Sequence, residues 1–290
     1  MQESNLQHNL SPSWTEVIEP RTSLFDLKLK EVWNYRDLLF MFVKRDFTAT
    51  YKQTILGPLW FFVQPILTTI MFTIVFGKFA GLSSDGQPRL LFYLSGLTVW
   101  NYFSDTFSKT SNVFTANAGI FGKVYFPRLV IPFSIVMSGL IRFFVQYFLF
   151  LLLFTFYLWR GNNIVNPSIY ILITPLLILM MAGFALGAGL IFSSLTTKYR
   201  DLGFLLTFGI QLLMYATPVI YPVNALPQKY QLFVLANPLS SIVESFRFAY
   251  LGTGHFSWQS LGYSAVVMFI LLFIGVVIFN KVEKSFMDTV

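Results

Sequence analysis

The chain has 290 residues, of which 55% are hydrophobic and 11% are charged, and its formal net charge is +7. Soluble domains usually carry about 25% charged residues, so this composition excludes an ordinary soluble domain. Several uncharged apolar runs approach the ~20 residues that cross a lipid bilayer as a helix. The sequence therefore predicts an all-α integral membrane protein of the cytoplasmic membrane.

The first predicted element is an amphipathic helix at residues 32–47, inside a cytoplasmic N-terminal region at 1–57. One side of its helical wheel is polar: Asn34, Asp37, Lys44 and Arg45. The other side is mostly apolar, so we expect the helix to lie in the membrane interface with that side against the acyl chains. A basic and aromatic collar follows directly before the first apolar run: Arg45, Tyr51, Lys52 and Gly57. Tyr51 and Lys52 would equally fit an ordinary pair at the membrane edge.

Six membrane spans are predicted within residues 58–280. They cover residues 58–77, 90–109, 129–159, 168–195, 202–221 and 262–279. Between the fifth and sixth spans, a segment at about 222–255 is apolar but interrupted by Pro222, Pro227 and Pro238. Proline breaks helices, and irregular backbone at membrane depth is tolerated only inside protein or beside water. We therefore expect short re-entrant or periplasmic helices there, and a cytoplasmic tail at 281–290.

Lysine and arginine are concentrated in the N-terminal region, in the connections between spans two and three and between spans four and five, and in the C-terminal tail. The positive-inside rule assigns these regions, and with them both termini, to the cytoplasm. It places Lys198 inside and Gln87 outside. The positive charge thus indicates topology and contact with lipid headgroups, and we expect no nucleic-acid partner.

Several stretches of the sequence together resemble the ABC type-2 permeases that export polysaccharides such as O-antigen and teichoic acid. They are RDFTATYKQTILGPLWFFVQPI at 45–66, KVYFPRLVIPF at 123–133, TPVIY at 217–221, NPLSSIVESFR at 237–247 and NKVEKSFMDTV at 280–290. These matches follow the order of the family along nearly the whole chain. The resemblance implies a permease subunit that pairs with a second copy of itself and with two separate ATP-binding cassette ATPase subunits. Its expected substrate is a lipid-linked polysaccharide.

The chain contains no phosphate-binding loop of the form G-x-x-x-x-G-K-[ST]. The nearest stretch, GIFGKV at 119–124, lacks both the loop length and the hydroxyl group. We therefore expect this chain to bind no cofactor, and ATP and Mg²⁺ to bind to the partner ATPase.

The loop at about 117–128 is short, cytoplasmic by the charge distribution, and rich in aromatic residues. Nothing in the sequence suggests what would bury Phe121, Tyr125 and Phe126, so we expect them to be exposed and to form a docking surface. The resemblance implies a coupling helix here that sits in a cleft of the ATPase. The predicted coupling residues are Asn117, Ile120, Phe121, Gly122, Lys123 and Tyr125. An interfacial aromatic belt is the alternative.

Two predicted spans carry polar residues at a spacing of four, which places each set on one helical face. The first span has Trp60, Gln64 and Thr68, and the fifth has Thr207, Gln211 and Tyr215. Polar groups inside a membrane are costly unless they face protein or water. The resemblance implies that these two spans line the translocation path. The predicted substrate channel comprises Trp60, Gln64, Thr68, Gln211, Tyr215 and Tyr221, and the alternative is that the aromatic residues only pack helices.

Two charged pairs are expected near or within the membrane. Arg142 lies too deep in the third span to reach the cytoplasm easily, so we expect it to pair with Asp105 of the second span. The resemblance would place an acidic residue near this point, so Arg142 departs from the family pattern. Glu244 and Arg247 stand three apart in the proline-broken segment, where on a helix they could pair and help to hold the exit of the path.

Two apolar features of the spans lead to packing predictions. Gly183 and Gly187 form a G-x-x-x-G face, which predicts close approach of a neighbouring helix. Phe150 is expected to face lipid.

An enzyme is disfavoured. The acids outside the N-terminal region and the tail are widely separated: Asp85, Asp105, Asp201 and Glu244. The two histidines, His8 and His255, show no metal-ligand spacing. Two alternatives stay open, namely a membrane enzyme acting on lipid-linked sugars and an ABC type-2 exporter of small amphiphiles. A neighbouring gene for an ATPase would argue against the first.

Overall fold

The computed structural model describes residues 29–52, 55, 57–121, 123–124, 126–160, 165–199 and 201–286, and these residues are helical throughout except for short connections. In chain order the elements are α1 (Leu29–Asn34), α2 (Arg36–Tyr51), the 3-10 turn η1 (Gly57–Leu59), α3 (Trp60–Phe72), the π-helical η2 (Thr73–Phe79), α4 (Arg89–Ser111), α5 (Val113–Phe121), α6 (Val130–Trp159), the 3-10 turn η3 (Ile169–Ile173), α7 (Thr174–Lys198), α8 (Leu202–Ala216), the 3-10 turn η4 (Val223–Ala225), α9 (Gln228–Ala236), α10 (Pro238–Leu251) and α11 (Trp258–Phe286).

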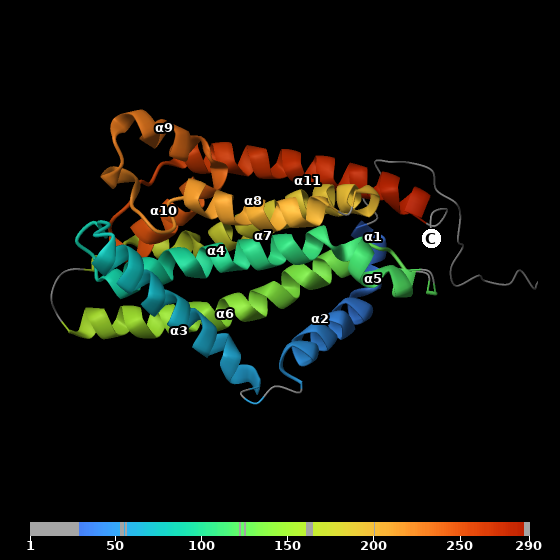
Figure 1. Ribbon diagram of the computed structural model, residues 1–290. Helices are drawn as coiled ribbons and strands as arrows, with labels where there is room; N and C mark the ends of the chain where they lie inside the picture. The colour runs from blue at the N-terminus through green and yellow to red at the C-terminus, as the bar shows by residue number, and fades with distance from the viewer. Residues whose placement is uncertain are drawn as a thin grey trace, which may run out of the picture.

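The long helices run side by side in an elongated bundle, and α3 crosses it obliquely (Figure 1). Helices α1 and α5, the α7–α8 connection and the C-terminal end of α11 lie at one end, which we name the α5 end. Helices α9 and α10 and the α6–α7 connection lie at the other, which we name the α9 end. The connections that carry most of the basic residues thus gather at the α5 end.

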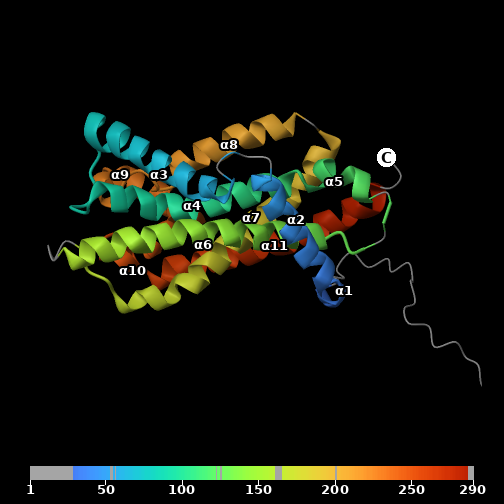
Figure 2. The same cartoon turned by 90° about the horizontal axis from the view of Figure 1, so that it is seen from below.

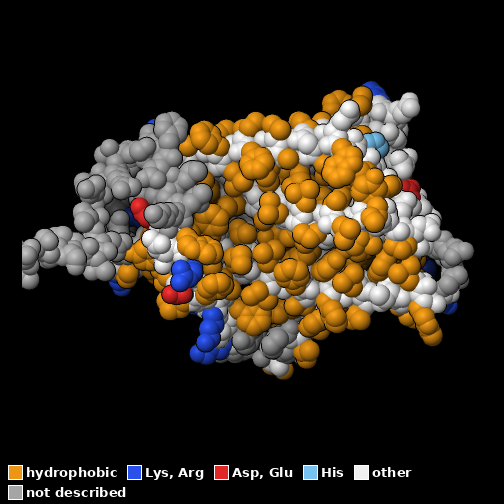
Figure 3. All heavy atoms as spheres, turned by 180° about the vertical axis from the view of Figure 1, so that it is seen from behind, with side chains coloured by type: hydrophobic (Ala, Val, Ile, Leu, Met, Phe, Trp, Pro, Cys, Tyr) orange, Lys and Arg blue, Asp and Glu red, His pale blue; other side chains and the backbone are white. Residues whose placement is uncertain are grey.

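Four helical stretches of the described residues are long and apolar enough to cross a membrane. They are Trp60–Phe79, Val130–Trp159, Ile169–Lys198 and Trp258–Glu283, and they coincide with the first, third, fourth and sixth predicted spans. On the face shown in Figure 3, hydrophobic side chains cover the middle of the bundle, and charged side chains appear only toward its two ends. This distribution is what a lipid bilayer requires of a protein that it surrounds.

Helix α4 coincides with the second predicted span, but it is more polar than the four apolar stretches and is packed inside the bundle. It contacts α3, α6, α7 and α10. Some of its buried hydroxyls bond to its own backbone: Ser95 donates to the carbonyl of Phe92 at 2.7 Å, and Thr98 donates to that of Leu94 at 2.7 Å. Polar side chains are tolerated in this helix because protein, rather than lipid, surrounds most of it.

Helix α8 is shorter than the fifth predicted span, which extends to residue 221. Helix α8 stops at Ala216, and Thr217 is extended, with φ −107° and ψ 140°. Pro218 follows Thr217, and a residue before proline is disfavoured in the helical region. The prediction of short helices between spans five and six is confirmed, since Pro222, Pro227 and Pro238 stand at the starts of η4, α9 and α10.

Phe150 is fully buried, so the prediction that it faces lipid is wrong. Its ring centroid lies 5.1 Å from that of Tyr250 and 5.4 Å from that of Phe246, both on α10. Helix α10 belongs to the proline-broken segment, about 100 residues further along the chain. The periodicity of α6 therefore could not indicate that α10 covers Phe150.

The close approach predicted at Gly183 and Gly187 is confirmed. A Cβ atom at Gly187 would stand 2.7 Å from the backbone nitrogen of Leu272 in α11, and one at Gly183 would stand 2.4 Å from the sulfur of Met268. Glycine is therefore required for the backbones of α7 and α11 to approach this closely.

The amphipathic helix predicted at 32–47 is present as α1 and α2, which are interrupted at Tyr35, and α2 continues to Tyr51. Val32 and Phe42 are buried in a second apolar cluster, at the α5 end, and α2 packs on α6. Trp33 and Phe40 remain exposed. The apolar residues of this helix thus serve two surfaces, one against the protein and one open to the surroundings.

Candidate translocation path and coupling region

The polar stripe predicted on the first span lies on the exposed side of α3. Trp60 is 46% exposed, Gln64 is exposed, and Thr68 is half-buried. The hydroxyl of Thr68 donates to the carbonyl of Gln64 at 2.9 Å. Pro65 and Thr69 are buried on the other side of the helix. The stripe therefore points away from the core of the chain.

The stripe on α8 is exposed as well. Thr207 and Gln211 are exposed and Tyr215 is 51% exposed, whereas Leu206 is the buried residue of this helix. Figure 2 shows α3 and α8 along the same edge of the bundle. The two helices that carry the stripes thus lie along one edge of the bundle, and the residues of both stripes are exposed or half-buried.

Tyr221 is brought next to Tyr215 by the break after α8. Its hydroxyl donates to the backbone carbonyl of Tyr215 at 2.8 Å, and its side chain is half-buried. The non-helical residues 217–221 therefore fold back over the last turn of α8. This contact joins two residues that the sequence assigned to the channel.

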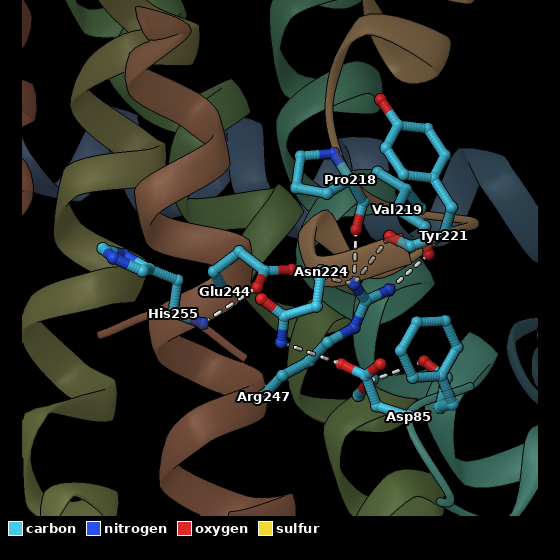
Figure 4. Close-up of polar contacts among 10 residues, drawn as sticks. Asp85, Pro218, Val219, Tyr221, Asn224, Glu244, Arg247 and His255 are labelled. Atoms are coloured by element: carbon cyan, nitrogen blue, oxygen red, sulfur yellow. Dashed lines mark hydrogen bonds and ion pairs between the residues drawn. The ribbon is translucent and has the colours of Figure 1, made fainter. Parts of the chain in front are cut away.

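Arg247 is fully buried at the α9 end and holds the segment after α8 in place (Figure 4). Its guanidinium donates to the carbonyls of Pro218 and Val219 and lies 3.4 Å from that of Tyr221. It also donates to Glu244 at 3.3 Å, which confirms the predicted pair. The five donors of a guanidinium suit this arrangement, because an ammonium group could not reach several carbonyls in one plane.

Glu244 and the neighbouring loops complete this cluster (Figure 4). Glu244 accepts a hydrogen bond at 3.0 Å from the backbone nitrogen of His255, and Asn224 donates to Asp85 at 3.4 Å. A Cβ atom at Gly96 of α4 would stand 2.6 Å from the Arg247 guanidinium, so only glycine leaves the required space. The cluster ties together the segment after α8, the α10–α11 loop and the α3–α4 loop. Nothing in the sequence indicated the roles of Gly96 and His255.

The pairing predicted for Arg142 is confirmed. Its guanidinium lies 3.5 Å from the carboxylate of Asp105, which links α6 to α4. One helical turn further toward the α9 end, Asn101 of α4 donates to Gln146 of α6 at 3.2 Å. Polar pairs therefore join these two helices along part of their length.

The predicted exposure of Phe121 and Phe126 is wrong, since both are buried. The ring of Phe121 lies 5.8 Å from that of Phe114 and 5.9 Å from that of Phe126, and Phe114 stacks on Phe279 of α11 at 4.6 Å. Phe126 also lies 5.9 Å from the ring of Phe42 on α2. The two loop rings are thus buried in a cluster with Phe114 of α5 and Phe42, and Phe114 connects this cluster to α11.

The other predicted coupling residues divide into buried and exposed ones. Asn117 is buried and donates to the carbonyl of Val113 at 3.0 Å, and Ile120 is half-buried. Lys123 and Val124 are exposed, the latter by 59%. Gly122 and Tyr125 lie outside the described residues. The surface that this loop offers to a partner therefore includes Lys123 and Val124 rather than its buried rings.

Arg128 anchors the end of α11 beneath this loop. It donates to the backbone carbonyl of Glu283 at 2.6 Å and stands over the ring of Phe121 at 5.4 Å. Burial lowers the pKa of the Arg128 guanidinium, and the nearby carboxylate of Glu283 opposes that shift. The loop, α5 and the end of α11 thus form one packed unit.

The predicted collar surrounds the turn between α2 and α3. Arg45 pairs with Asp46 at 2.8 Å and stands over the ring of Phe42 at 4.7 Å. Lys52 is exposed. Gly57 has φ +51°, a left-handed conformation that glycine adopts without strain. Tyr51 is the last residue of α2, and its side chain lies outside the described part of the structure.

Apolar helices long enough to cross a bilayer and a hydrophobic middle surface define an integral membrane protein. Residues 37–251 match the profile of the ABC-2 type transporter, and the chain belongs to that family.

Its relatives align with it over nearly their whole length. The O-antigen export system permease protein RfbA of Klebsiella pneumoniae is 29% identical over 264 residues, which cover 90% of this chain and 98% of the relative. Another RfbA of Klebsiella pneumoniae is 30% identical over 259 residues, covering 87% and 94%. The polysialic acid transport protein KpsM of Escherichia coli is 24% identical over 248 residues, covering 84% and 93%.

Proposed function

We propose that this chain is the permease subunit of an ATP-driven ABC exporter that moves a polysaccharide, in lipid-linked form, across the cytoplasmic membrane. The observation that carries this proposal is the similarity to permeases of O-antigen export and polysialic acid transport over most of both chains. The chain is a transporter permease and not an enzyme.

The proposed topology has six spans, with both termini in the cytoplasm. Helix α4 has 23 residues and would rise about 34 Å, which is enough to cross a bilayer. Helix α8 has 15 residues, about 22 Å, and the segment after it would complete the crossing. The α5 end then faces the cytoplasm, and α9 and α10 form the re-entrant segment on the other side. Residues 1–57, 58–280 and 281–290 are the proposed N-terminal region, transmembrane domain and tail.

The proposed path runs between two copies of the chain. In each copy the stripes of α3 and α8 are exposed on one side of the bundle, and lipid would be an unfavourable neighbour for their polar groups. A second copy placed there would enclose both stripes around a water-filled route. Aromatic faces could stack on sugar rings, and the amides could bond to sugar hydroxyls.

The proposed partner for energy supply is a pair of ABC ATPase subunits, which bind ATP and Mg²⁺. Their docking site would be the α5 end around residues 117–128. Support comes from the packed unit of α5 with the end of α11, since a rigid unit can transmit a movement of the ATPase to the spans.

A deletion experiment tests the proposed function. In a strain that lacks the chain, lipid-linked glycan of full length should accumulate in the cytoplasm, and expression of the chain together with its ATPase should clear it. A membrane enzyme would instead leave an unfinished glycan, and an exporter of small amphiphiles would leave the glycan unaffected. Either result would contradict the proposal.

A further inference from the structure

Helix α4 carries a polar face that the predicted path did not include. Asn101, Ser104, Asp105 and Ser108 follow one another at spacings of three, one and three residues, which places them on one side of the helix. Asp105 is exposed, and the other three are half-buried. By contrast, Phe103 and Phe107 on another side of the same helix are buried in the core. This face is therefore the open side of a helix that is otherwise packed inside the bundle.

Two of these side chains are held from behind by α6. Asn101 donates to Gln146 at 3.2 Å, and Asp105 pairs with Arg142 at 3.5 Å. The side chain of Arg142 is 17% exposed, whereas that of Asp105 is 52% exposed. The arginine thus lies at the back, and the carboxylate stands at the front with free lone pairs on its open side.

A half-exposed carboxylate in a predicted span needs a polar neighbour. Charged groups are strongly unfavourable against hydrocarbon, and those inside membrane proteins face protein or a water-filled cavity. Since only part of Asp105 is covered by its own chain, the rest must face water or polar groups of another molecule.

The face continues into an open pocket of mixed lining at the α5 end. Ser108 and Lys109 of α4 and the following Asn112 line this pocket together with Arg45 and Asp46 of α2, and its volume is about 490 Å³. Its apolar side is formed by Ile120, Ile131 and Ile135. A hydrophilic molecule that enters this pocket would therefore reach Ser108 first and Asp105 next.

We propose that the polar face of α4 is a third wall of the translocation path and binds hydroxyl groups of the moving glycan. This inference rests on the proposed function and extends its path, which otherwise consists of the stripes on α3 and α8. The pairs Asp105–Arg142 and Asn101–Gln146 are each neutral in total, which suits uncharged hydroxyls, and the exposed Lys109 adds one positive charge beside them. Carboxylates accept from hydroxyls, and amides both donate and accept, so each sugar can be held and released in turn.

Labelling of single cysteines tests whether the polar face of α4 is exposed to water. The chain contains no cysteine, so Ser104→Cys and Ser108→Cys each introduce the one thiol of the molecule with little change in shape. The matched control is Phe148→Cys, because Phe148 is 55% exposed and lies two residues from Gln146, on the opposite side of α6. The probe is a positively charged methanethiosulfonate added to membranes that contain the assembled transporter.

Both serine positions should react about ten-fold faster than position 148 or more, because the reactive thiolate forms in water and is disfavoured in apolar surroundings. Modification at position 104 should also stop export, since the added group would occupy the path. Equal, slow reaction at positions 104 and 148, or rapid reaction at 104 that leaves export unchanged, would overturn the proposal.

Charge variants separate glycan contact from a structural role. Asp105→Asn keeps the shape of the side chain but leaves Arg142 without its counter-ion, so both the amount of protein and export should fall. Exchanging the pair, Asp105→Arg with Arg142→Asp, should restore the amount of protein in the membrane, while export stays several-fold below that of the unmodified chain. Full recovery of export by the exchange would show a purely structural pair and would overturn the proposal.

One comparison keeps this test separate from that of the proposed function. Gln211→Cys on α8 probes the path without α4. Rapid labelling at 211 together with slow labelling at 104 would refute the third wall and leave the path between α3 and α8 intact. The deletion experiment does not depend on any of these positions.

Discussion

At the level of single residues, Arg247 connects several parts of the fold through one buried side chain. Its guanidinium satisfies carbonyls of the segment after α8, pairs with Glu244, and lies 3.9 Å from the ring centre of Phe92 on α4. Those carbonyls have no helical partner, because α8 has ended, so they need a donor from elsewhere. The buried charge thus allows a non-helical stretch to exist inside the protein.

We expect Arg247→Ala to destabilise the protein by about 3–5 kcal/mol, because it leaves the buried carboxylate of Glu244 and three carbonyls without their donor. The thermal midpoint of the detergent-purified protein should fall. Arg247→Lys should recover only part of the loss, since an ammonium cannot reproduce the planar fork. Arg160→Ala, which removes an exposed arginine at the end of α6, is the control and should change little. An unchanged midpoint for Arg247→Ala would contradict this assignment.

The aromatic residues of the proposed path give a second prediction at this scale. Trp60→Ala and Tyr215→Ala should each slow export roughly five-fold, because one lost stacking surface weakens glycan contact by about 1 kcal/mol. The amount of protein should stay normal, since both side chains are about half exposed. Phe148→Ala is the appropriate control, whereas Phe150→Ala would open a cavity in the core. Export at the normal rate in both path variants would favour a packing role.

Among the elements, α5 and the loop after it combine a buried and an exposed part. Phe121 and Phe126 fasten the loop to the core, and Lys123 and Val124 remain outside. This arrangement explains why Phe121 and Phe126 are buried, although the sequence predicts that they are exposed. An aromatic residue in a short loop indicates that some surface will cover it, but it does not say whether that surface belongs to a partner or to the chain itself.

Replacing Lys123 by Glu together with Val124 by Asp should uncouple the transporter. The exposed docking surface would change its charge and lose its apolar contact, while the core below it stays intact. We expect normal insertion in the membrane, continued ATP hydrolysis by the ATPase, and export reduced several-fold. Lys229→Glu makes a similar charge change on α9, at the opposite end, and should not affect coupling. If the double variant exported normally, the docking surface would lie elsewhere.

For the whole molecule, the connections rich in lysine and arginine lie at one end of the bundle, and the connections poor in them lie at the other. The basic connections lie at the α5 end, and the proline-broken segment lies at the α9 end (Figure 1). Gln87 belongs to the α3–α4 connection, at the α9 end, but it is 7% exposed and its amide donates to the carbonyl of Leu251 at 3.2 Å. Ser83 in the same connection is exposed and is a better position for labelling.

The topology can be measured with an impermeant thiol reagent on intact spheroplasts. Ser83→Cys should be labelled, and Lys198→Cys should be labelled only after the membrane is permeabilised, because the positive-inside rule places the basic end in the cytoplasm. Both side chains are exposed in the structure, so burial would not explain a negative result. Labelling of position 198 but not of position 83 would invert the proposed orientation.

The sequence by itself determined the class of the protein, its helical segments and its family, because long apolar runs, helical periodicity and motif order are local properties that can be read along the chain. The i, i+4 stripes on α3 and α8 and the pairs Asp105–Arg142 and Glu244–Arg247 also belong to this group.

Only the tertiary structure decided which side chains that the sequence left exposed are buried, and which residue satisfies the backbone of the segment after α8. Phe150 and Gln87 are covered by α10 and by its end, which lie between about 95 and 165 residues away in the sequence. Phe121 packs on Phe114, whose ring in turn stacks on Phe279 of α11. Pro218 disfavours continuation of helix α8 beyond Ala216, and the carbonyls that follow find their donor in Arg247, on another helix. Burial depends on contacts between distant segments, and the periodicity of one segment contains no information about the segment that will pack against it.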